Sequence, residues 1–299
     1  MSAKILILGS TGFVGKNLAE CLENDFKLIK TCRRKDAPNS NDYIFLDLFN
    51  KDSWGRVVEE KPDIVINAAA YGVVKLQQDL ETTYNINFFL IQAFYNFLTQ
   101  NDCHPFWIQI GTAFEYDLSA VTIDENTVCL PQTHYGISKL MMSNFLKAKS
   151  RKNNFTILRP FGMFGKYEDD SKFFPMLISS QKNKNKINLS PGTQKRDYVY
   201  VKDLGTFIKH LILEKKYFKL PQVINIGSGK AISFKDYASI LQCEFSDFDP
   251  ELWNWGAVSF RQCESEIFYS SSLLAISLGF KTSSLQESFK ETSNYYYNN

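Results

Sequence analysis

Short apolar runs alternate with stretches of helical spacing through the first half of the chain. Residues 4–8 are apolar after Lys4 and stop at Gly9, and residues 16–24 then have the spacing of a helix. Similar apolar runs follow at residues 26–32, 43–46, 63–70, 106–111 and 156–159. This repeated strand–helix alternation predicts an α/β fold built on a doubly wound parallel sheet.

Residues 83–98 have apolar side chains on nearly every face of a predicted helix, among them Phe88, Phe89, Phe94 and Leu98. A helix that is hydrophobic all round is buried on all sides. Two interpretations stay open, an internal core helix and a helix in a subunit interface. Further along, we expect residues 182–186 to form a solvated loop and the tyrosine-rich tail after Asn294 to be frayed.

Composition excludes several classes of protein. The 299 residues are 44% hydrophobic, enough for a core in one large domain or two smaller ones. A net charge of +2 gives no reason to expect a nucleic acid or an anionic membrane as partner. No uncharged apolar stretch approaches the ~18 residues of a membrane span, and no signal-peptide pattern is present. Scattered cysteines without C-x-x-C and isolated histidines predict reduced thiols, a cytoplasmic protein and no metal site.

A glycine-rich turn follows the first apolar run. Its spacing is G-x-x-G-x-x-G, and the segment consists of Gly9, Ser10, Thr11, Gly12, Phe13, Val14 and Gly15. Glycines permit a tight turn and close approach of backbone to a pyrophosphate, and the following helix presents free N–H groups to that anion. We therefore expect a dinucleotide cofactor here.

The residues after the second predicted strand bear on which dinucleotide binds. An acidic residue at the strand tip would favour NAD, but the chain has Arg33 and Arg34 there. Guanidinium groups match phosphate geometry, so we expect NADP(H). Asp47 and Leu48, which follow the third predicted strand, are expected to contact the adenine.

Tyr135 and Lys139 lie four residues apart, which places them on one face of a helix. A lysine ammonium beside a phenol favours the phenolate, so we expect Tyr135 to exchange a proton nearer neutral pH.

In these motifs and their order, the sequence resembles the extended short-chain dehydrogenase/reductases, in particular the branch that modifies nucleotide-linked sugars. The resemblance runs through the glycine loop, Asn67, Asn87, Thr112, Tyr135 and Lys139, and the segments 158–165, 196–201 and 225–229. It implies an NADP-binding Rossmann domain at residues 1–165 and a smaller, mostly nucleotide-sugar-binding domain at 166–299. A strand near residues 223–226 would return to the large sheet. Ala68, Ala69, Ala70 and Pro160 would line the cofactor site.

The resemblance also implies a catalytic set of Thr112, Tyr135 and Lys139. Thr112 would hydrogen-bond a substrate carbonyl oxygen, Tyr135 would donate a proton to it, and Lys139 would tune Tyr135 and hold the nicotinamide ribose. Nucleotide-sugar dehydratases of this family have Thr-Asp-Glu, whereas this chain has Thr112, Ala113 and Phe114, and Glu115 is one position too late. Dehydration is therefore not expected. Thr112, Ala113 and Phe114 are expected to contact the substrate.

The C-terminal part resembles the 4-keto-6-deoxy-sugar reductases of the family. By that analogy Arg196 and Arg261 would bind the nucleotide diphosphate, and Lys172 and Phe173 would line the sugar-nucleotide cleft. The expected reaction is NADPH-dependent reduction of the C4 keto group of a nucleotide-linked 4-keto-6-deoxyhexose. Three alternatives stay open: a C4 epimerase with tightly bound NAD, a reductase of another small carbonyl compound, and a non-catalytic NADP-binding protein. We also expect a homodimer that pairs residues 83–98 and the helix from Tyr135 onward in a four-helix bundle.

Overall fold

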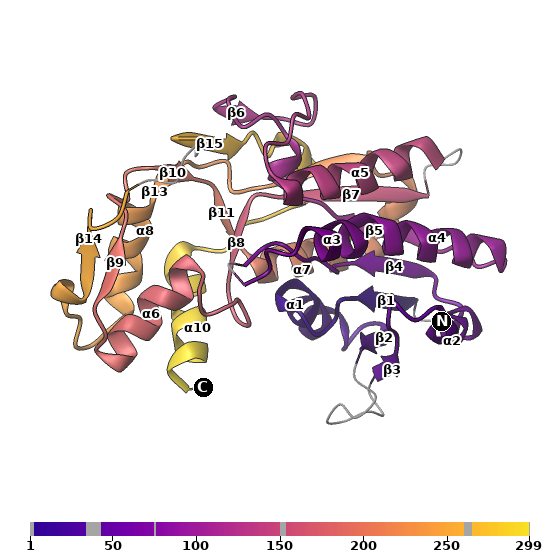
Figure 1. Ribbon diagram of the computed structural model, residues 1–299, viewed down its shortest axis with the longest axis horizontal. Helices are drawn as coiled ribbons and strands as arrows, with labels where there is room; N and C mark the ends of the chain where they lie inside the picture. The colour runs from indigo at the N-terminus through magenta and orange to yellow at the C-terminus, as the bar shows by residue number, and fades with distance from the viewer. Residues whose placement is uncertain (1–2, 34–42, 75, 150–153, 260–264, 299) are drawn as a thin grey trace.

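A seven-stranded parallel sheet forms the centre of the larger domain in the computed structural model, which describes residues 3–33, 43–74, 76–149, 154–259 and 265–298 (Figure 1). The strand order is β12-β7-β5-β4-β1-β2-β3, and every neighbouring pair is parallel. The predicted doubly wound sheet is confirmed. The strands are β1 (Lys4–Leu8), β2 (Lys27–Cys32), β3 (Tyr43–Phe45), β4 (Ile64–Asn67), β5 (Phe106–Ile110), β7 (Phe155–Pro160) and β12 (Val223–Ile226).

Helices cover both faces of this sheet. On one face, α1 (Phe13–Leu22) and α7 (Val201–Leu213) share a core with α9 (Leu273–Ser277). On the other face, α2 (Gly55–Glu60), α4 (Leu90–Gln100) and α5 (His134–Lys149) share a second core. The chain order reverses where β1 separates β4 from β2, and ligands of such sheets bind at this point, outside the carboxyl ends of the strands.

The apolar stretch at residues 83–98 forms part of a continuous helical run rather than one regular helix. Its segments are α3 (Leu80–Tyr84), a π-helical turn η3 (Asn85–Phe89) and α4. Ile91, Phe94 and Leu98 are buried against the sheet, whereas Phe89 is 49% exposed. The interpretation as an internal core helix is therefore wrong, because one face of the run reaches the surface.

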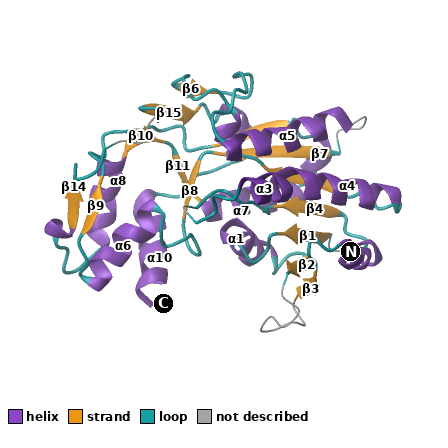
Figure 2. Cartoon of the chain, in the orientation of Figure 1, coloured by secondary structure: helices purple, strands orange, loops and turns teal. Residues whose placement is uncertain are grey.

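The smaller domain combines three helices with short strands (Figure 2). Its helices, α6 (Phe173–Asn183), α8 (Phe234–Leu241) and α10 (Leu285–Asn298), enclose an aromatic core around Phe174, Tyr237 and Phe289. The strand pairs are β8 (Gly162–Phe164) with β11 (Tyr198–Tyr200), and β9 (Ile187–Leu189) with β14 (Trp253–Trp255). A four-stranded sheet joins β13 (Ile232–Ser233), β10 (Lys195–Arg196), β15 (Ile267–Ser270) and β6 (Thr122–Ile123).

The remaining described elements are short 3-10 helices: η2 (Lys51–Ser53), η4 (Ala113–Glu115), η5 (Lys216–Lys219), η6 (Gln242–Glu244) and η7 (Pro250–Leu252). The expected return of a strand near residues 223–226 is confirmed by β12. However, α7 and α9 also pack in the core of the larger domain, so the region 166–299 crosses between the two domains more often than the sequence indicated.

The prediction of a frayed C-terminal tail is wrong. Helix α10 extends to Asn298, and Phe289 in its middle is fully buried. The Tyr296 hydroxyl donates a 2.6 Å hydrogen bond to the carbonyl oxygen of Glu168. Residues 182–186 are exposed, as expected of a solvated segment, although Lys182 and Asn183 still belong to α6.

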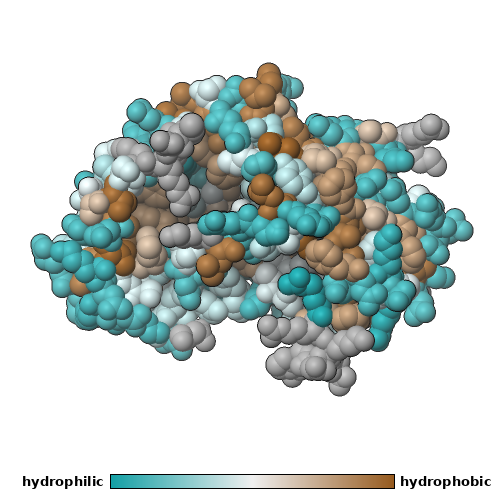
Figure 3. Space-filling view, in the orientation of Figure 1, coloured by the Kyte–Doolittle hydropathy of each residue, from teal (hydrophilic) through white to brown (hydrophobic). Residues whose placement is uncertain are grey.

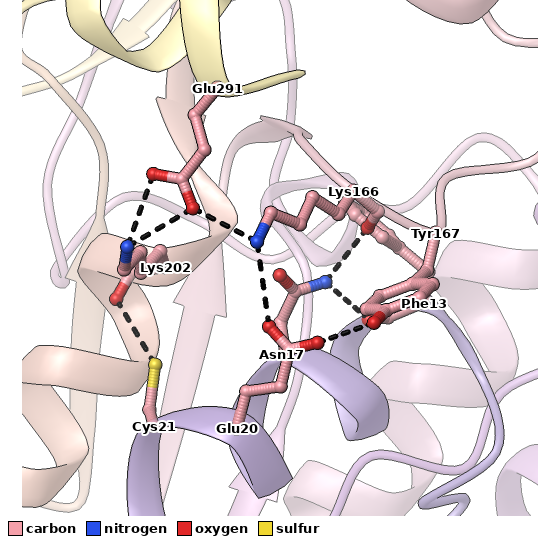
Figure 4. Close-up of polar contacts among 8 residues, drawn as sticks. All are labelled: Phe13, Asn17, Glu20, Cys21, Lys166, Tyr167, Lys202 and Glu291. Atoms are coloured by element: carbon pink, nitrogen blue, oxygen red, sulfur yellow. Dashed lines mark hydrogen bonds and ion pairs between the residues drawn. The ribbon is translucent and has the colours of Figure 1, made fainter. Parts of the chain in front are cut away.

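Ionic contacts join the two domains next to α1 (Figure 4). Lys166, which follows β8, lies 3.9 Å from Glu20 on α1 and 3.1 Å from Glu291 on α10. Lys202 on α7 also pairs with Glu291 at 3.1 Å. The side chain of Asn17 donates to the Lys166 carbonyl oxygen at 2.9 Å, which ties the cofactor-loop helix to the second domain. In the described parts of the chain, no helix has the length and apolar character needed to cross a bilayer.

Candidate active site

The glycine loop lies between the end of β1 and the start of α1, at the expected place. Gly9 has φ 75°, and a Cβ there would lie 2.8 Å from the Ala69 backbone. A Cβ at Gly15 would lie 2.1 Å from the Gly9 carbonyl oxygen, so both glycines are needed for packing. Gly12 is open by comparison and is the N-cap of α1, and as a glycine it has no side chain to cover the N–H groups of the first turn. This cradle of backbone N–H groups fits a pyrophosphate.

Ser10 is tied to the neighbouring strand. Its hydroxyl accepts a hydrogen bond from the Thr31 amide at 2.9 Å and donates to the Thr31 carbonyl at 2.8 Å. A contact between Ser10 and a cofactor would therefore come from its backbone. The same bonds fix the end of β2, after which Arg33 is exposed. Arg34 lies outside the described residues.

Asp47 and Leu48 differ in their surroundings. Leu48 is buried in the core that contains Trp54. The Asp47 carbonyl accepts from the Trp54 indole at 3.1 Å, and its carboxylate accepts from the Phe49 amide at 3.1 Å. Asp47 is half-buried and is the more open of the pair.

Asn87 connects the loop after β4 to the helix that holds the catalytic candidates. Its side-chain amide donates to the Tyr71 carbonyl at 2.8 Å, and its oxygen accepts from the Tyr71 amide at 2.9 Å. The same amide group also donates to the Ser138 hydroxyl of α5 at 2.9 Å. Ala68, Ala69 and Ala70 form the first part of this loop, while Pro160 ends β7 on the other side of β5. Asn87 therefore has a positioning role that its motif did not reveal.

Thr112 and Tyr135 meet at the carboxyl end of β5. The Thr112 side chain lies close enough to the Tyr135 phenol to lower its pKa, against the larger opposing effect of burial. The Thr112 hydroxyl also accepts from the Phe114 amide at 3.3 Å, where it begins η4. A Cβ at position 136 would lie 2.2 Å from the Phe114 carbonyl, so Gly136 lets the first turn of α5 lie directly on η4.

Burial controls the protonation of Tyr135 and Lys139. Burial raises the pKa of Tyr135 above its ordinary value, and the Glu115 carboxylate raises that pKa further. We expected Lys139 to lower the pKa of Tyr135, and this prediction is wrong for the protein without a bound cofactor. Burial also lowers the pKa of Lys139 to about 8, although Glu115 opposes that shift. A phenol that stays protonated is suited to donate a proton, not to accept one.

Glu115 is a buried structural anchor that the sequence did not identify. It is fully buried, and its Oε2 accepts from the Arg159 guanidinium at 2.7 Å and from the Ser143 hydroxyl at 2.6 Å. Its other oxygen accepts from the Thr112 amide at 3.0 Å. The signal for this pair was an arginine within an otherwise apolar strand, because a buried guanidinium needs an acidic partner.

Arg196 ends β10 in the four-stranded sheet of the smaller domain. It is 7% exposed, and its guanidinium stacks 4.8 Å from the centre of the Phe268 ring. Its Nη1 donates to the carbonyl oxygens of Lys195 at 2.8 Å and Glu266 at 3.3 Å. Arg261, its expected partner, lies outside the described residues.

Lys172 and Phe173 form the start of α6 at the border between the domains. The Lys172 ammonium donates to the Val73 carbonyl in the loop that follows β4. The Phe173 ring packs edge-on against Phe234 at 4.5 Å and lies 6.4 Å from the Trp255 ring. Within the described ranges, no three His, Cys, Asp or Glu side chains gather as metal ligands would.

The chain is similar to known proteins over most of its length. dTDP-4-dehydro-6-deoxyglucose reductase of Escherichia coli is 24% identical over 250 residues, which cover 77% of this chain and 78% of that protein. CDP-abequose synthase of Salmonella typhimurium is 21% identical over 276 residues, covering 89% and 88%. Among solved structures, UDP-N-acetylglucosamine 4-epimerase from Methanobrevibacter ruminantium superposes with a TM-score of 0.85 at 19% identity and covers 99% of this chain and 98% of that one. The model of the NAD dependent epimerase/dehydratase family matches residues 5–227, and the chain belongs to this family.

Proposed function

We propose that this protein reduces the C4 keto group of a nucleotide-linked 4-keto-6-deoxyhexose with NADPH. The observation that carries the proposal is the pairing of Thr112 with Tyr135 beside a turn that offers no free acid or base. The acid in that turn, Glu115, is buried against Arg159. Water elimination needs an acid and a base at the substrate, whereas carbonyl reduction needs a hydride, a proton and polarisation of the carbonyl oxygen.

The side chains divide the work as follows. The Thr112 and Tyr135 hydroxyls converge where the carbonyl oxygen would lie, and the protonated Tyr135 donates its proton there as negative charge develops. Lys139 lies one turn further along α5 and, when charged, stabilises that negative charge. A nicotinamide cofactor, when bound, supplies the hydride, and the loop from Gly9 to Gly15 would hold its diphosphate.

Arg33 supports NADPH as the cofactor. It is exposed at the end of β2, where a 2′-phosphate would lie in a dinucleotide bound at this sheet. A charge-assisted hydrogen bond there would contribute about 1.5–3 kcal/mol, enough for a tenfold or greater preference over NADH.

The names of the relatives support a deoxysugar substrate. They include a dTDP-4-dehydro-6-deoxyglucose reductase, a GDP-L-colitose synthase from Yersinia pseudotuberculosis and a CDP-abequose synthase. These names involve three different nucleotides, so the proposal covers the sugar and leaves the base to experiment.

A C4 epimerase is the second candidate. Solved structures with this fold include UDP-glucose 4-epimerase of Thermus thermophilus, determined with NAD, at a TM-score of 0.83 and 17% identity. The hydroxyl pair of Thr112 and Tyr135 suits either reaction, because both involve proton exchange at a sugar oxygen. Release of bound NAD on denaturation, with C4 inversion of a nucleotide sugar, would favour this candidate.

The test is oxidation of NADPH by the purified protein with a panel of nucleotide-linked 4-keto-6-deoxyhexoses, generated in place by a 4,6-dehydratase. Rapid oxidation with one member, slower with NADH, is the expected result. Tyr135→Phe should lower the rate by about 10²–10⁴-fold, because the proton donor is lost. Tyr95→Phe, which removes a hydroxyl from the neighbouring helix α4, is the matched control. No oxidation with any member would refute the proposal, and a fully active Tyr135→Phe would refute the role of Tyr135.

A further inference from the structure

An aromatic strip leads from the catalytic hydroxyls toward Arg196. Phe114 is 43% exposed, whereas Ala113 and Glu115 on either side of it are 1% and 0% exposed. Its ring meets the Phe268 ring edge-on, with the centres 6.2 Å apart. Phe268 is in turn covered by the Arg196 guanidinium, 4.8 Å from the ring centre. Phe114 is therefore the exposed side chain among the three described residues of η4.

The backbone fixes Phe114 beside the reacting position. Its amide donates to the Thr112 hydroxyl at 3.3 Å, and its carbonyl lies directly against the first turn of α5 at Gly136. The half-exposed ring is thus adjacent to the pair formed by Thr112 and Tyr135, and a sugar carbonyl placed on those hydroxyls has the Phe114 ring next to it.

The chemistry of the strip selects one edge of the sugar. In a pyranose, C4 and C1 lie on opposite sides of the ring. A sugar with C4 at the catalytic hydroxyls and C1 toward Arg196 therefore places one of its two edges against Phe114. The C2–C3 edge of a hexose normally has hydroxyl groups, which need hydrogen-bond partners when they are buried. The C5–O5 edge of a 6-deoxyhexose has a methyl group and no hydroxyl. Phe114 offers exposed apolar surface that matches this second edge, and the buried Phe268 ring supports it from behind.

We propose that Phe114 determines specificity by packing against C5 and the C6 methyl group of the sugar. This inference rests on the proposed function, since it assumes a sugar carbonyl at Thr112 and Tyr135. Phe114 contacts the methyl group and leaves a C6 hydroxyl without a partner. Discrimination of this kind between a methyl group and a hydroxylated analogue is about tenfold to hundredfold.

The reverse reaction tests the inference, because both substrates are then stable alcohols. NADP⁺ reduction would be measured with dTDP-, GDP-, CDP- and UDP-linked 6-deoxyhexoses and with the matching sugars that have a C6 hydroxyl. The native protein should prefer the 6-deoxy sugar in kcat/KM by about tenfold to hundredfold. Phe114→Ser should bring this ratio close to one, mainly by losing activity on the 6-deoxy sugar. Phe114→Leu should keep most of the preference, because it keeps the apolar surface.

Two controls separate this inference from the proposed function. Leu213→Ser removes an apolar side chain of similar exposure, 52%, from the end of α7 and should leave the ratio unchanged. If the native protein is active but Phe114→Ser keeps the native ratio, the inference is overturned and the proposed function stands. A Phe114→Ser variant that changes discrimination at C2 or C3 instead also overturns it. If the native protein acts on none of these sugars in either direction, both proposals fall together.

Discussion

Lys139 shows at the residue scale how burial couples catalysis to stability. Its side chain is 2% exposed, and burial lowers its pKa to about 8. Lysine in an unfolded chain titrates near ~10.4, so between about pH 8 and ~10.4 the unfolded chain binds a proton that the folded protein lacks. The free energy of unfolding therefore rises with pH in this window, and below it the buried charge costs on the order of 3 kcal/mol.

Lys139→Met should accordingly be more stable than the native protein at about pH 7, by up to ~3 kcal/mol, and this gain should shrink as the pH rises above about 8 and vanish only above ~10.4. Denaturant unfolding at several pH values measures the difference. Lys149→Met, an exposed lysine near the end of the same helix, is the control and should show no such trend. A gain that stays constant with pH would show that it comes from packing and not from the charge.

Residues were predictable where a motif has a fixed spacing. Thr112 follows a strand and Tyr135 and Lys139 share one helix, as their spacing predicted, because strand ends and helix periodicity determine where such residues lie. Their catalytic roles stay predictions. The contacts of Glu115 and Asn87 were not predictable, because their partners are remote in sequence: Arg159 is 44 residues away and Ser138 is 51 residues away. A pattern in one segment does not specify which distant group will satisfy a buried polar atom.

At the scale of elements, the ion pair of Glu115 and Arg159 connects the turn η4 to the strand β7. The Ser143 hydroxyl donates to the same carboxylate, which connects helix α5 to both of them. Removing one partner leaves the other charge buried and uncompensated, so Glu115→Leu and Arg159→Met should each lower the free energy of unfolding by about 3–5 kcal/mol. The double variant should lose much less than the sum, because neither buried charge then remains.

A double-mutant cycle in denaturant measures this coupling. The matched control is the exposed pair of Lys202 and Glu291, whose side chains are 52% and 33% exposed and which should couple by no more than about 1 kcal/mol. Additive losses at Glu115 and Arg159 would contradict the idea that these elements depend on the ion pair.

Element types were more predictable than element ends. The strands of the large sheet were predicted from the sequence because a β-strand buried on both faces has a continuous run of apolar residues. The fourth strand ends at Asn67 and not at Ala70, because the chain leaves the sheet there to form the site. The C-terminal helix was missed because its burial depends on aromatic partners in the second domain, such as Phe174 against Phe289 at 5.1 Å.

At the scale of the whole molecule, the order of motifs predicted the family and the fold. It did not predict how the chain crosses between the domains. The apolar pattern of helix α7 would be the same whether its apolar face packed against α1, as it does, or against the smaller domain. The apolar surface left by α3 and η3 raises the remaining question. Leu80 and Phe89 are each 49% exposed, and Phe88 places its ring 6.4 Å from that of Phe145 on α5. Figure 3 shows apolar side chains gathered between α5 and α4 on this face.

We propose that a second copy of the chain covers this face and forms a four-helix bundle, because an exposed apolar patch on paired helices typically marks an interface. Light scattering at micromolar concentration should give twice the chain mass, and Phe89→Glu should give monomers because it places a charge in the apolar contact. Phe49→Glu is the control, since Phe49 is 52% exposed and lies after β3, away from this face. The apparent stability of the native protein should also rise with protein concentration, whereas that of Phe89→Glu should not. A native protein that scatters as a monomer would refute the interface and would leave the active-site proposals unchanged, since Thr112, Tyr135 and Lys139 all belong to one chain.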